Sequence, residues 1–128
     1  MRDIAVRLTN YPGELARVAS VLSQHGVNLK SLTGLAIGRL VTLRLIPDDI
    51  DAARAALDAA DIHFRESEVV QVLLENRAGE LAMVSSRLAE GHVNLQAIYV
   101  TGTTDRLVTL ALVPDNVINA RRLLDDGA

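Results

Sequence analysis

A short loop rich in turn-forming residues occurs twice and carries the groups best suited to binding a ligand. The first copy is Asn10, Tyr11, Pro12, Gly13, Glu14 and Leu15, and the second, 66 positions later, is Asn76, Arg77, Ala78, Gly79, Glu80 and Leu81. Pro12 is tolerated in the first turn of a helix, and Gly13 has no side chain to keep a ligand from the backbone. The N-terminus of a helix has free N–H groups and a partial positive charge. The loop therefore predicts a binding position for a carboxylate.

An asparagine follows each of these loops and supplies a second polar group. Asn28 precedes Leu29, and Asn94 precedes Leu95. A carboxamide both donates and accepts hydrogen bonds, and a free amino acid, with its carboxylate and its ammonium group, needs partners of both kinds. A purely structural reading stays open, because each loop is also a good strand-to-helix turn and each asparagine can bond its own backbone.

The two loops belong to an internal duplication. At an offset of 66 the block "GELARV" falls on "GELAMV" and "VNL" falls on "VNL"; after one added residue the offset is 67 and "RLVTLRLIPD" falls on "RLVTLALVPD". Such agreement over a fixed period marks two copies of one structural unit. The added residue is expected in a turn near Gly102, where a cluster of threonine and aspartate tolerates a change in length.

The hydrophobic pattern predicts the same elements in both copies. Residues 4–8 alternate apolar and polar side chains, as in a strand with one buried face. Leu15, Val18, Ala19 and Leu22 then recur at helical spacing. The stretch 27–47 reads as two strands joined near Gly38. Asp48 or Asp115 is expected to open a second helix, and residues 62–68 supply a last strand in the first copy.

The order of elements is β-α-β-β-α-β, which predicts an α+β, ferredoxin-like fold in two tandem copies. The copies are expected to span residues 1–68 and 69–128, the second lacking its last strand. That strand would flank residues 69–76, which read "VVQVLLEN" and are apolar on both faces. An unprotected edge of this kind invites pairing, so we expect another chain or the linker strand to cover it.

The motifs resemble those of the ACT domain, a small regulatory module of βαββαβ fold that is often attached to enzymes of amino-acid metabolism. The resemblance lies in "N-x-P-G-x-L" opening a helix and "G-x-N-L" opening the next strand, and it covers nearly the whole chain. It implies that small effectors bind between two paired modules. The candidate ligand-binding residues are Asn10, Tyr11, Pro12, Gly13, Glu14, Leu15, Asn28, Leu29, Asn76, Arg77, Ala78, Gly79, Leu81, Asn94 and Leu95.

The second copy departs from this pattern at three positions. Ala78 replaces the proline, which makes that turn less rigid. Arg77 adds a cation, which can hold an acidic group or extend into solvent. His92 stands where the first copy has Gly26. The two pockets are therefore not expected to be equivalent.

Composition excludes several other functions. The chain has 128 residues, a net charge of −3, one Phe, two Tyr, no Trp and no Cys. It has neither the basic surface nor the aromatic platform of a nucleic-acid reader, and no thiol for a disulfide, for catalysis or for zinc. No apolar run reaches the roughly 18 residues of a membrane span, and no signal peptide is evident. We expect a cytoplasmic protein that binds neither nucleic acid nor membrane.

No catalytic or metal-binding constellation is readable. His25, His63 and His92 lack metal-ligand spacing, and no Ser-His-Asp or Cys-His set is present. Acylphosphatase-like enzymes share the βαββαβ topology, but they use an arginine in the first loop, and only Arg77 could serve here. We therefore expect no cofactor, no metal and no enzymatic activity.

These observations predict a regulatory protein that binds an amino-acid effector, forms a homodimer and modulates a partner enzyme of amino-acid metabolism. The alternative is a regulatory subunit that binds proteins and no small ligand. The sequence names neither the effector nor the partner.

Overall fold

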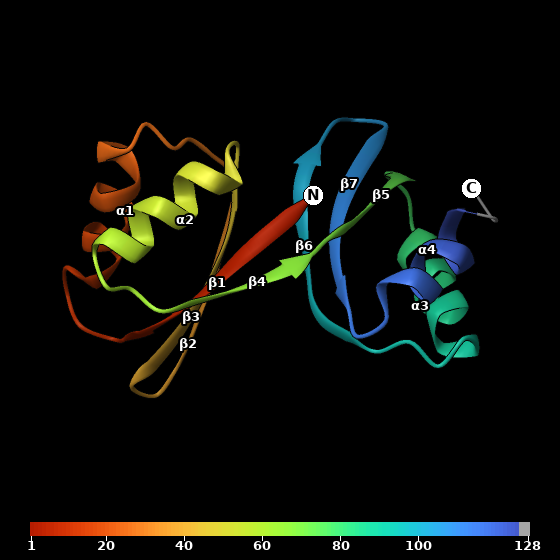
Figure 1. Ribbon diagram of the computed structural model, residues 1–128. Coiled ribbons are helices and arrows are strands. Elements are labelled where there is room, and N and C mark those ends of the chain that lie inside the picture. Colours follow the sequence, from red (N-terminus) through yellow and green to blue (C-terminus); the bar gives the residue numbers. More distant parts are fainter. Residues whose placement is uncertain (126–128) are drawn as a thin grey trace. The chain divides into compact units, whose positions relative to one another are not determined.

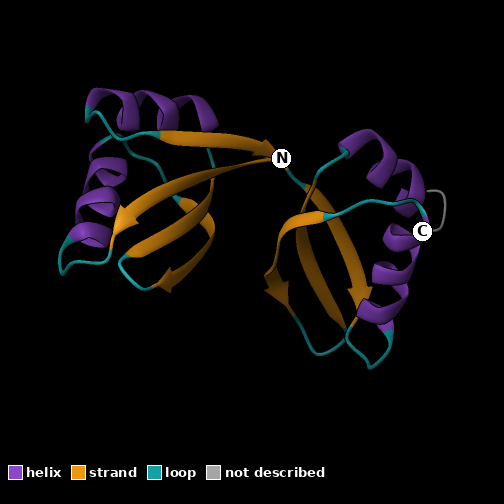
Figure 2. Ribbon diagram, turned by 90° about the horizontal axis from the view of Figure 1, so that it is seen from below, coloured by secondary structure: helices purple, strands orange, loops and turns teal. Residues whose placement is uncertain are grey.

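The computed structural model describes residues 1–125, which form two compact units. The N-terminal unit comprises Arg2–Ser67, and the C-terminal unit comprises the residues from Glu68 onward together with Met1. Each unit is an antiparallel sheet with two helices on one face (Figures 1 and 2). This two-layer arrangement buries the apolar face of the sheet beneath the apolar sides of the helices.

The N-terminal unit has the complete βαββαβ order. Its elements are β1 (Arg2–Thr9), α1 (Glu14–Gln24), β2 (Leu29–Ile37), β3 (Leu40–Pro47), α2 (Ile50–Ala59) and β4 (Phe64–Glu68). The strands lie in the order β2-β3-β1-β4, so β2 and β4 are the two edges. The predicted ferredoxin-like fold is confirmed.

The C-terminal unit repeats this order without the last strand. Its elements are β5 (Val70–Glu75), α3 (Glu80–Glu90), β6 (Leu95–Thr103), β7 (Leu107–Pro114) and α4 (Val117–Asp125). The strand order is β5-β7-β6. Among the described residues no strand flanks β5 on its outer side, so β5 is an edge here, whereas its counterpart β1 is interior.

The core of each unit follows from the alternation of the strands. In the N-terminal unit Ile4 and Val6 stand opposite Leu45 and Leu43, and all four side chains are buried beneath the helices. The residues that complete this core are Leu8, Val18, Leu22, Val27, Ala53, Ala56, Leu57 and Ile62. Leu15 and Ala19, which share the helical spacing, stay exposed, so the core stripe of α1 is narrower than the sequence predicts.

The added residue of the second copy lies in a strand and not in a turn. Opposite β7, Val100 pairs with Leu110 and Gly102 pairs with Thr109, which leaves Thr101 as a bulge within β6. The bulge absorbs one residue because two residues of one strand then oppose one of its partner. The expected turn at Gly102 is therefore wrong, and the chain reverses after Thr104, whose N–H donates to the carbonyl of Leu107 at 2.8 Å.

Asp48 and Asp115 hold the start of a strand and do not cap the second helices. The N–H of Asn28 donates to Asp48 Oδ1 at 3.0 Å, and the N–H of Asp48 donates to the carbonyl of Asn28 at 2.8 Å. Asn94 and Asp115 make the same pair of bonds at 3.1 and 2.9 Å. The caps are the next residues along, Asp49 on α2 and Asn116 on α4. Each helix therefore begins one residue later than the sequence analysis places it.

A cluster of charged side chains ties β4 to α2 in the N-terminal unit. Arg54 donates to both oxygens of Glu66, at 2.6 and 2.7 Å, and Arg2 donates to Glu66 at 3.1 Å. The hydrogen bond from Arg54 is the main reason why the pKa of Glu66 lies below its ordinary value, against the opposing effect of partial burial. Because the pKa is lowered in the folded state, ionised Glu66 stabilises the fold.

This cluster predicts a pH-dependent difference between the wild type and Glu66→Gln. The stabilisation by Glu66 is present above the ordinary glutamate pKa of 4.5 and is lost as the pH falls through the lower pKa of the folded state. The difference in unfolding free energy between the wild type and Glu66→Gln, measured by urea titration, should therefore be largest near neutral pH and should shrink below pH 4.5. A difference that stays constant down to about pH 3 would contradict the proposed effect.

The backbone conformation of His92 predicts a second effect on stability. It follows α3 with φ at +58°, where its counterpart Gly26 has φ at +70°. A side chain in this left-handed region costs about 1 kcal/mol. His92→Gly should therefore raise the free energy of unfolding by up to about 1 kcal/mol, as measured by urea titration.

The matched variant His92→Ala removes the imidazole and keeps the β-carbon. It should bring no gain, because the strain comes from the β-carbon. Equal effects of the two variants would show that the imidazole and not the backbone sets the stability at this position.

Candidate ligand-binding loops

The asparagine that begins each loop ties the loop to the tip of a neighbouring hairpin. The N–H of Asn10 donates to the carbonyl of Arg39 at 2.7 Å, and its side chain lies 3.5 Å from the carbonyl of Gly38. Asn76 repeats these bonds to the carbonyls of Arg106, at 2.7 Å, and Thr104, at 3.1 Å. Both asparagines, predicted as ligand contacts, thus have a structural role that holds the loop in place.

A glycine in a left-handed conformation turns each loop into its helix. Gly13 has φ 92° and ψ −13°, and Gly79 has φ 92° and ψ −18°. A β-carbon built on either glycine would meet no atom within 4 Å, so the conformation and not a lack of space calls for glycine. The same openness lets a ligand approach the backbone.

The helices that follow these glycines have no side-chain cap. The N-cap residues of α1 and α3 have no side chain that accepts from the helix amides, whereas the side chain of Asp49 accepts from Ala52 at 3.1 Å on α2 and that of Asn116 accepts from Asn119 at 2.9 Å on α4. Free donors at the start of a helix attract an anion. Both copies of the repeat cap the second helix and leave the first one open.

The open amides can be named from the hydrogen bonds around them. In the first loop the N–H of Glu14 donates to the carbonyl of Tyr11 at 3.3 Å, and that of Arg17 to the carbonyl of Gly13 at 2.9 Å. Between them, the amides of Leu15 and Ala16 have no acceptor among residues 1–125. In the second loop Met83 bonds to Gly79, which leaves the corresponding amides of Leu81 and Ala82 without an acceptor there.

The side chains of the loops are largely exposed. Tyr11 and Leu15 are 64% and 53% exposed, and Leu81 is 52% exposed. The acids of the helical turns pair with arginines. Glu14 accepts from Arg17 at 2.9 Å, while Arg77 lies 3.0 Å from Glu75 and 3.9 Å from Glu80. Glu14, a predicted ligand contact, is therefore engaged in an ion pair, and Arg77 is already flanked by two carboxylates.

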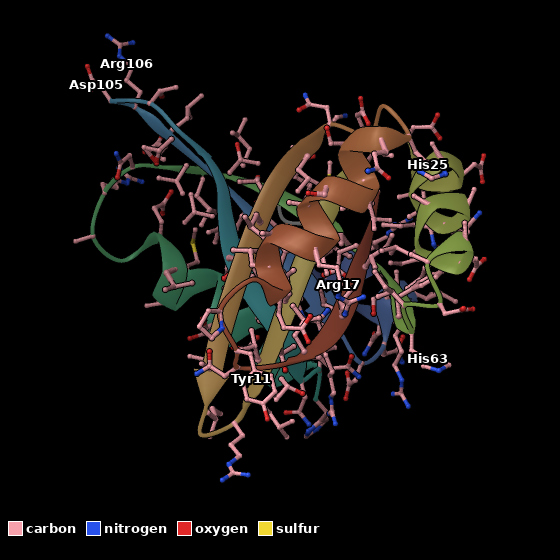
Figure 3. All side chains as sticks on the ribbon, turned by 90° about the vertical axis from the view of Figure 1, so that its left-hand side faces the viewer. Tyr11, Arg17, His25, His63, Asp105 and Arg106 are labelled. Atoms are coloured by element: carbon pink, nitrogen blue, oxygen red, sulfur yellow. The ribbon has the colours of Figure 1, made fainter. Side chains whose placement is uncertain are left out.

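Asn28 lies at the opposite end of α1 from the loop. Figure 3 labels Tyr11 beside the start of this helix and His25 at its end, and Asn28 follows His25 by three residues. A helix of 11 residues is about 16 Å long. One amino acid therefore cannot touch the amides near Gly13 and the side chain of Asn28 in the same unit. Asn94 and Gly79 are separated by α3 in the same way.

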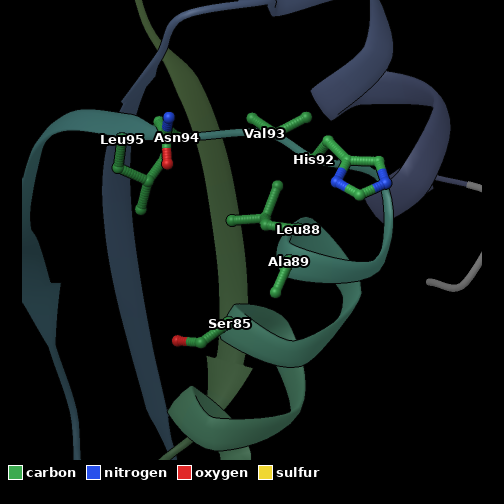
Figure 4. Close-up of a pocket in the computed structure, with 7 residues that line it drawn as sticks. All are labelled: Ser85, Leu88, Ala89, His92, Val93, Asn94 and Leu95. Atoms are coloured by element: carbon green, nitrogen blue, oxygen red, sulfur yellow. The ribbon is translucent and has the colours of Figure 1, made fainter.

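A shallow hollow lies beside Asn94, against the C-terminal half of α3 (Figure 4). It has a volume of about 500 Å³ and is lined by Ser85, Leu88, Ala89, His92, Val93, Asn94 and Leu95. The hydroxyl of Ser85 donates to the carbonyl of Leu81 at 2.8 Å. Asn94 and Leu95 are among the predicted ligand contacts, and His92 is distinguished in the sequence only as a departure from glycine. Ser85 and Ala89 are absent from the predicted site because their helical spacing is that of ordinary packing.

The histidines, all within residues 1–125, are not arranged as metal ligands. His25 lies 3.1 Å from the carbonyl of Val21 through Nδ1, and within residues 1–125 no three His, Asp or Glu side chains gather as metal ligands would. None of the described helices is long and apolar enough to cross a membrane.

No known family profile matches the chain, and no curated protein is significantly similar to it. Solved structures are similar. Protein BT0572 from Bacteroides thetaiotaomicron is 25% identical with a TM-score of 0.89, and the match covers 98% of this chain and 87% of that one. The ligand-free regulatory subunit of aspartate kinase from Thermus thermophilus is 16% identical with a TM-score of 0.67, covering 98% and 91%. The regulatory subunit from Thermus flavus is 16% identical with a TM-score of 0.64, covering 98% and 90%.

These similarities extend over both units. Two features of the structure agree with these similarities. Each unit follows the βαββαβ order, which is complete in the first unit and lacks the last strand in the second. Each unit also has a strand-to-helix loop that ends in a left-handed glycine. The chain therefore has the fold of two tandem ACT domains, as its motifs predict.

Proposed function

We propose that this chain is a regulatory protein that binds a free amino acid and modulates a partner enzyme of amino-acid metabolism. The observation that carries the proposal is the open N-terminus of α1 and α3, repeated in both units while α2 and α4 are capped by side chains. A carboxylate accepts hydrogen bonds from such free amides and is stabilised by the helix dipole.

The C-terminal end of α1 suits the ammonium group of a free amino acid. The carbonyls at the C-terminus of a helix carry a partial negative charge, and α1 has no basic residue in its last turn. Asn28 adds a carboxamide at this end, and its side chain has no hydrogen-bond partner among residues 1–125. An ammonium group is therefore favoured beside Asn28, as a carboxylate is favoured beside Gly13.

The two half-sites meet when two modules pair along β2. This strand is an edge of its sheet, and it runs from the end near Asn28 to the end near the loop of Gly13. Antiparallel pairing with β2 of a second copy sets the start of one strand beside the end of the other. Asn28 of one chain then lies beside the Gly13 loop of the other. We therefore propose a homodimer with two equivalent effector sites.

The site of the C-terminal unit has a different chemistry. Arg77 replaces Tyr11 in the loop, and His92 replaces Gly26 near the asparagine. Both changes add groups that can carry positive charge. We propose that any ligand of this unit differs from that of the N-terminal unit.

Regulation is proposed from the fold and from the relatives. Two of the similar structures are regulatory subunits of aspartate kinase, and the sequence shows no Ser-His-Asp or Cys-His set. An effector bound between two modules stabilises the paired state over the unpaired one. A partner enzyme that binds only one of these states then responds to the amino acid.

A regulatory subunit without a small ligand is the second candidate, and one observation favours it. The tip of the β2–β3 hairpin exposes three aliphatic side chains, Leu35 at 65%, Ile37 at 75% and Leu40 at 58%. The corresponding positions of the C-terminal unit are Gly102, Thr104 and Leu107, so only one aliphatic side chain remains there, and it is 39% exposed. A patch of large apolar side chains on one unit suits contact with another protein.

The two candidates differ in a thermal-shift screen of the purified chain against the twenty free amino acids. Under the first, one amino acid or a few related ones raise the unfolding midpoint by several degrees, because ligand at 100 times its Kd adds about 2.7 kcal/mol. Gly13→Val combined with Asn28→Ala should abolish that ligand-induced shift in protein whose circular dichroism matches that of the wild type, since both half-sites are altered; the circular dichroism is needed because Gly13 has φ 92°.

Asp49→Ala is the matched control for this experiment. It removes the cap of α2, should cost about 1 kcal/mol of stability, and should leave the ligand-induced shift intact. A wild type that responds to none of the amino acids would favour the second candidate. A full shift in the double variant would show that the ligand binds elsewhere.

A further inference from the structure

The outer edge of β5 presents unpaired backbone groups. The N–H of Asn76 donates toward β7, to the carbonyl of Arg106, so alternation directs the even-numbered residues of the strand toward β7 and the odd-numbered ones outward. Gln71, Leu73 and Glu75 are the outward residues. Among residues 1–125 their N–H groups have no acceptor, and only the carbonyl of Glu75 is used, by the N–H of Arg77 at 2.9 Å.

The corresponding edge of the N-terminal unit is covered. There β4 lies against β1, so the outward groups of β1 belong to a sheet. The residue of β1 that corresponds to Leu73 is Arg7, at an offset of 66. Leu73 is 62% exposed. The unit with the bare edge thus places an aliphatic side chain where the covered unit has a cation, although exposed edges are ordinarily protected by charge.

We propose that β5 pairs antiparallel with β5 of a second copy, with Leu73 on the two-fold axis. In this register Leu73 stands opposite the partner's Leu73, and Gln71 stands opposite the partner's Glu75. The two exposed leucines then cover each other, and the carboxamide of Gln71 can donate to the carboxylate of Glu75. On the helix-covered face Val72 stands opposite the partner's Leu74, which continues the apolar face of the sheet.

The register follows from which groups are already occupied. The N–H of Val69 also points outward, but it donates to the carbonyl of Met1 at 2.8 Å. A register centred on Gln71 or on Val72 would require Val69 as a pairing residue and would bring Leu73 opposite Val69 or Gln71. The register centred on Leu73 uses residues 71, 73 and 75, whose N–H groups are all available. The carbonyl of Glu75 already accepts from Arg77, but its second lone pair can accept from the partner.

The pairing joins two sheets of three strands in the order β6-β7-β5-β5-β7-β6. It uses the opposite edge of the C-terminal unit from β6, and a different unit from the β2 edge of the proposed effector site. Amino-acid binding and β5 pairing can therefore succeed or fail independently of each other.

Leu73→Arg tests the proposal by giving β5 the residue that β1 has. Two arginines opposite each other on the two-fold axis repel, so two copies of this variant should no longer pair through β5. Sedimentation equilibrium of the full chain should show an assembly of half the mass of the wild type. Val100→Arg is the matched control, because Val100 is 55% exposed on β6, the opposite edge of the same sheet; it should leave the mass unchanged.

Amide hydrogen exchange measured by NMR tests the hydrogen bonds between the two β5 strands directly. In the wild type the amides of Gln71 and Leu73 should exchange slowly, and in Leu73→Arg at least about ten times faster, while the amides of β7 keep their rates. The unchanged β7 rates show that the variant is folded. A monomeric wild type, an unchanged mass in Leu73→Arg, or rapid exchange at residues 71 and 73 in the associated wild type would each overturn the proposal.

Discussion

Each unit depends on a glycine held in the left-handed region at the start of its first helix. This conformation lets the chain turn from the first strand of the unit directly into a helix that covers the sheet, without a side chain at the turn. A residue with a capping side chain would satisfy the helix amides itself. Because glycine cannot, the turn that makes the two-layer fold also leaves donors exposed at a defined place. Fold and binding capacity therefore share one local constraint.

Much of the fold could be predicted from sequence because its determinants are local. The alternation in residues 4–8 defines the buried face of β1, and the recurrence of "GELA" and "VNL" shows that the second unit must repeat the first. Two features could not be predicted in this way. A bulge at Thr101 and a turn look alike in an alignment, since both add one residue. Asp48 and Asp49 are adjacent acids, and only the register of β2 against β3 determines which of them is free to cap the helix.

The candidate site was harder to predict because it is not local. Gly13 and Asn28 stand out together in the sequence, yet a full helix separates them. In the function that we propose they act together only across two paired modules, and one sequence carries little information about how modules pair. Residues such as Ser85 and Ala89 were missed for a different reason. Their spacing is that of ordinary helix packing, and no pattern distinguishes a helix face that borders a hollow from one that borders a core.

The pair of backbone bonds between Asn28 and Asp48 bears on how this protein can change over time. The fold uses the N–H and carbonyl of Asn28, which every residue except proline provides, and it takes the side chain only from Asp48. Asn94 and Asp115 divide the roles in the same way. The fold therefore uses the aspartate side chain at positions 48 and 115, whereas it places no demand on the side chain of the residue before the strand. Positions 28 and 94, where we propose ligand contacts, can therefore change with little risk to folding.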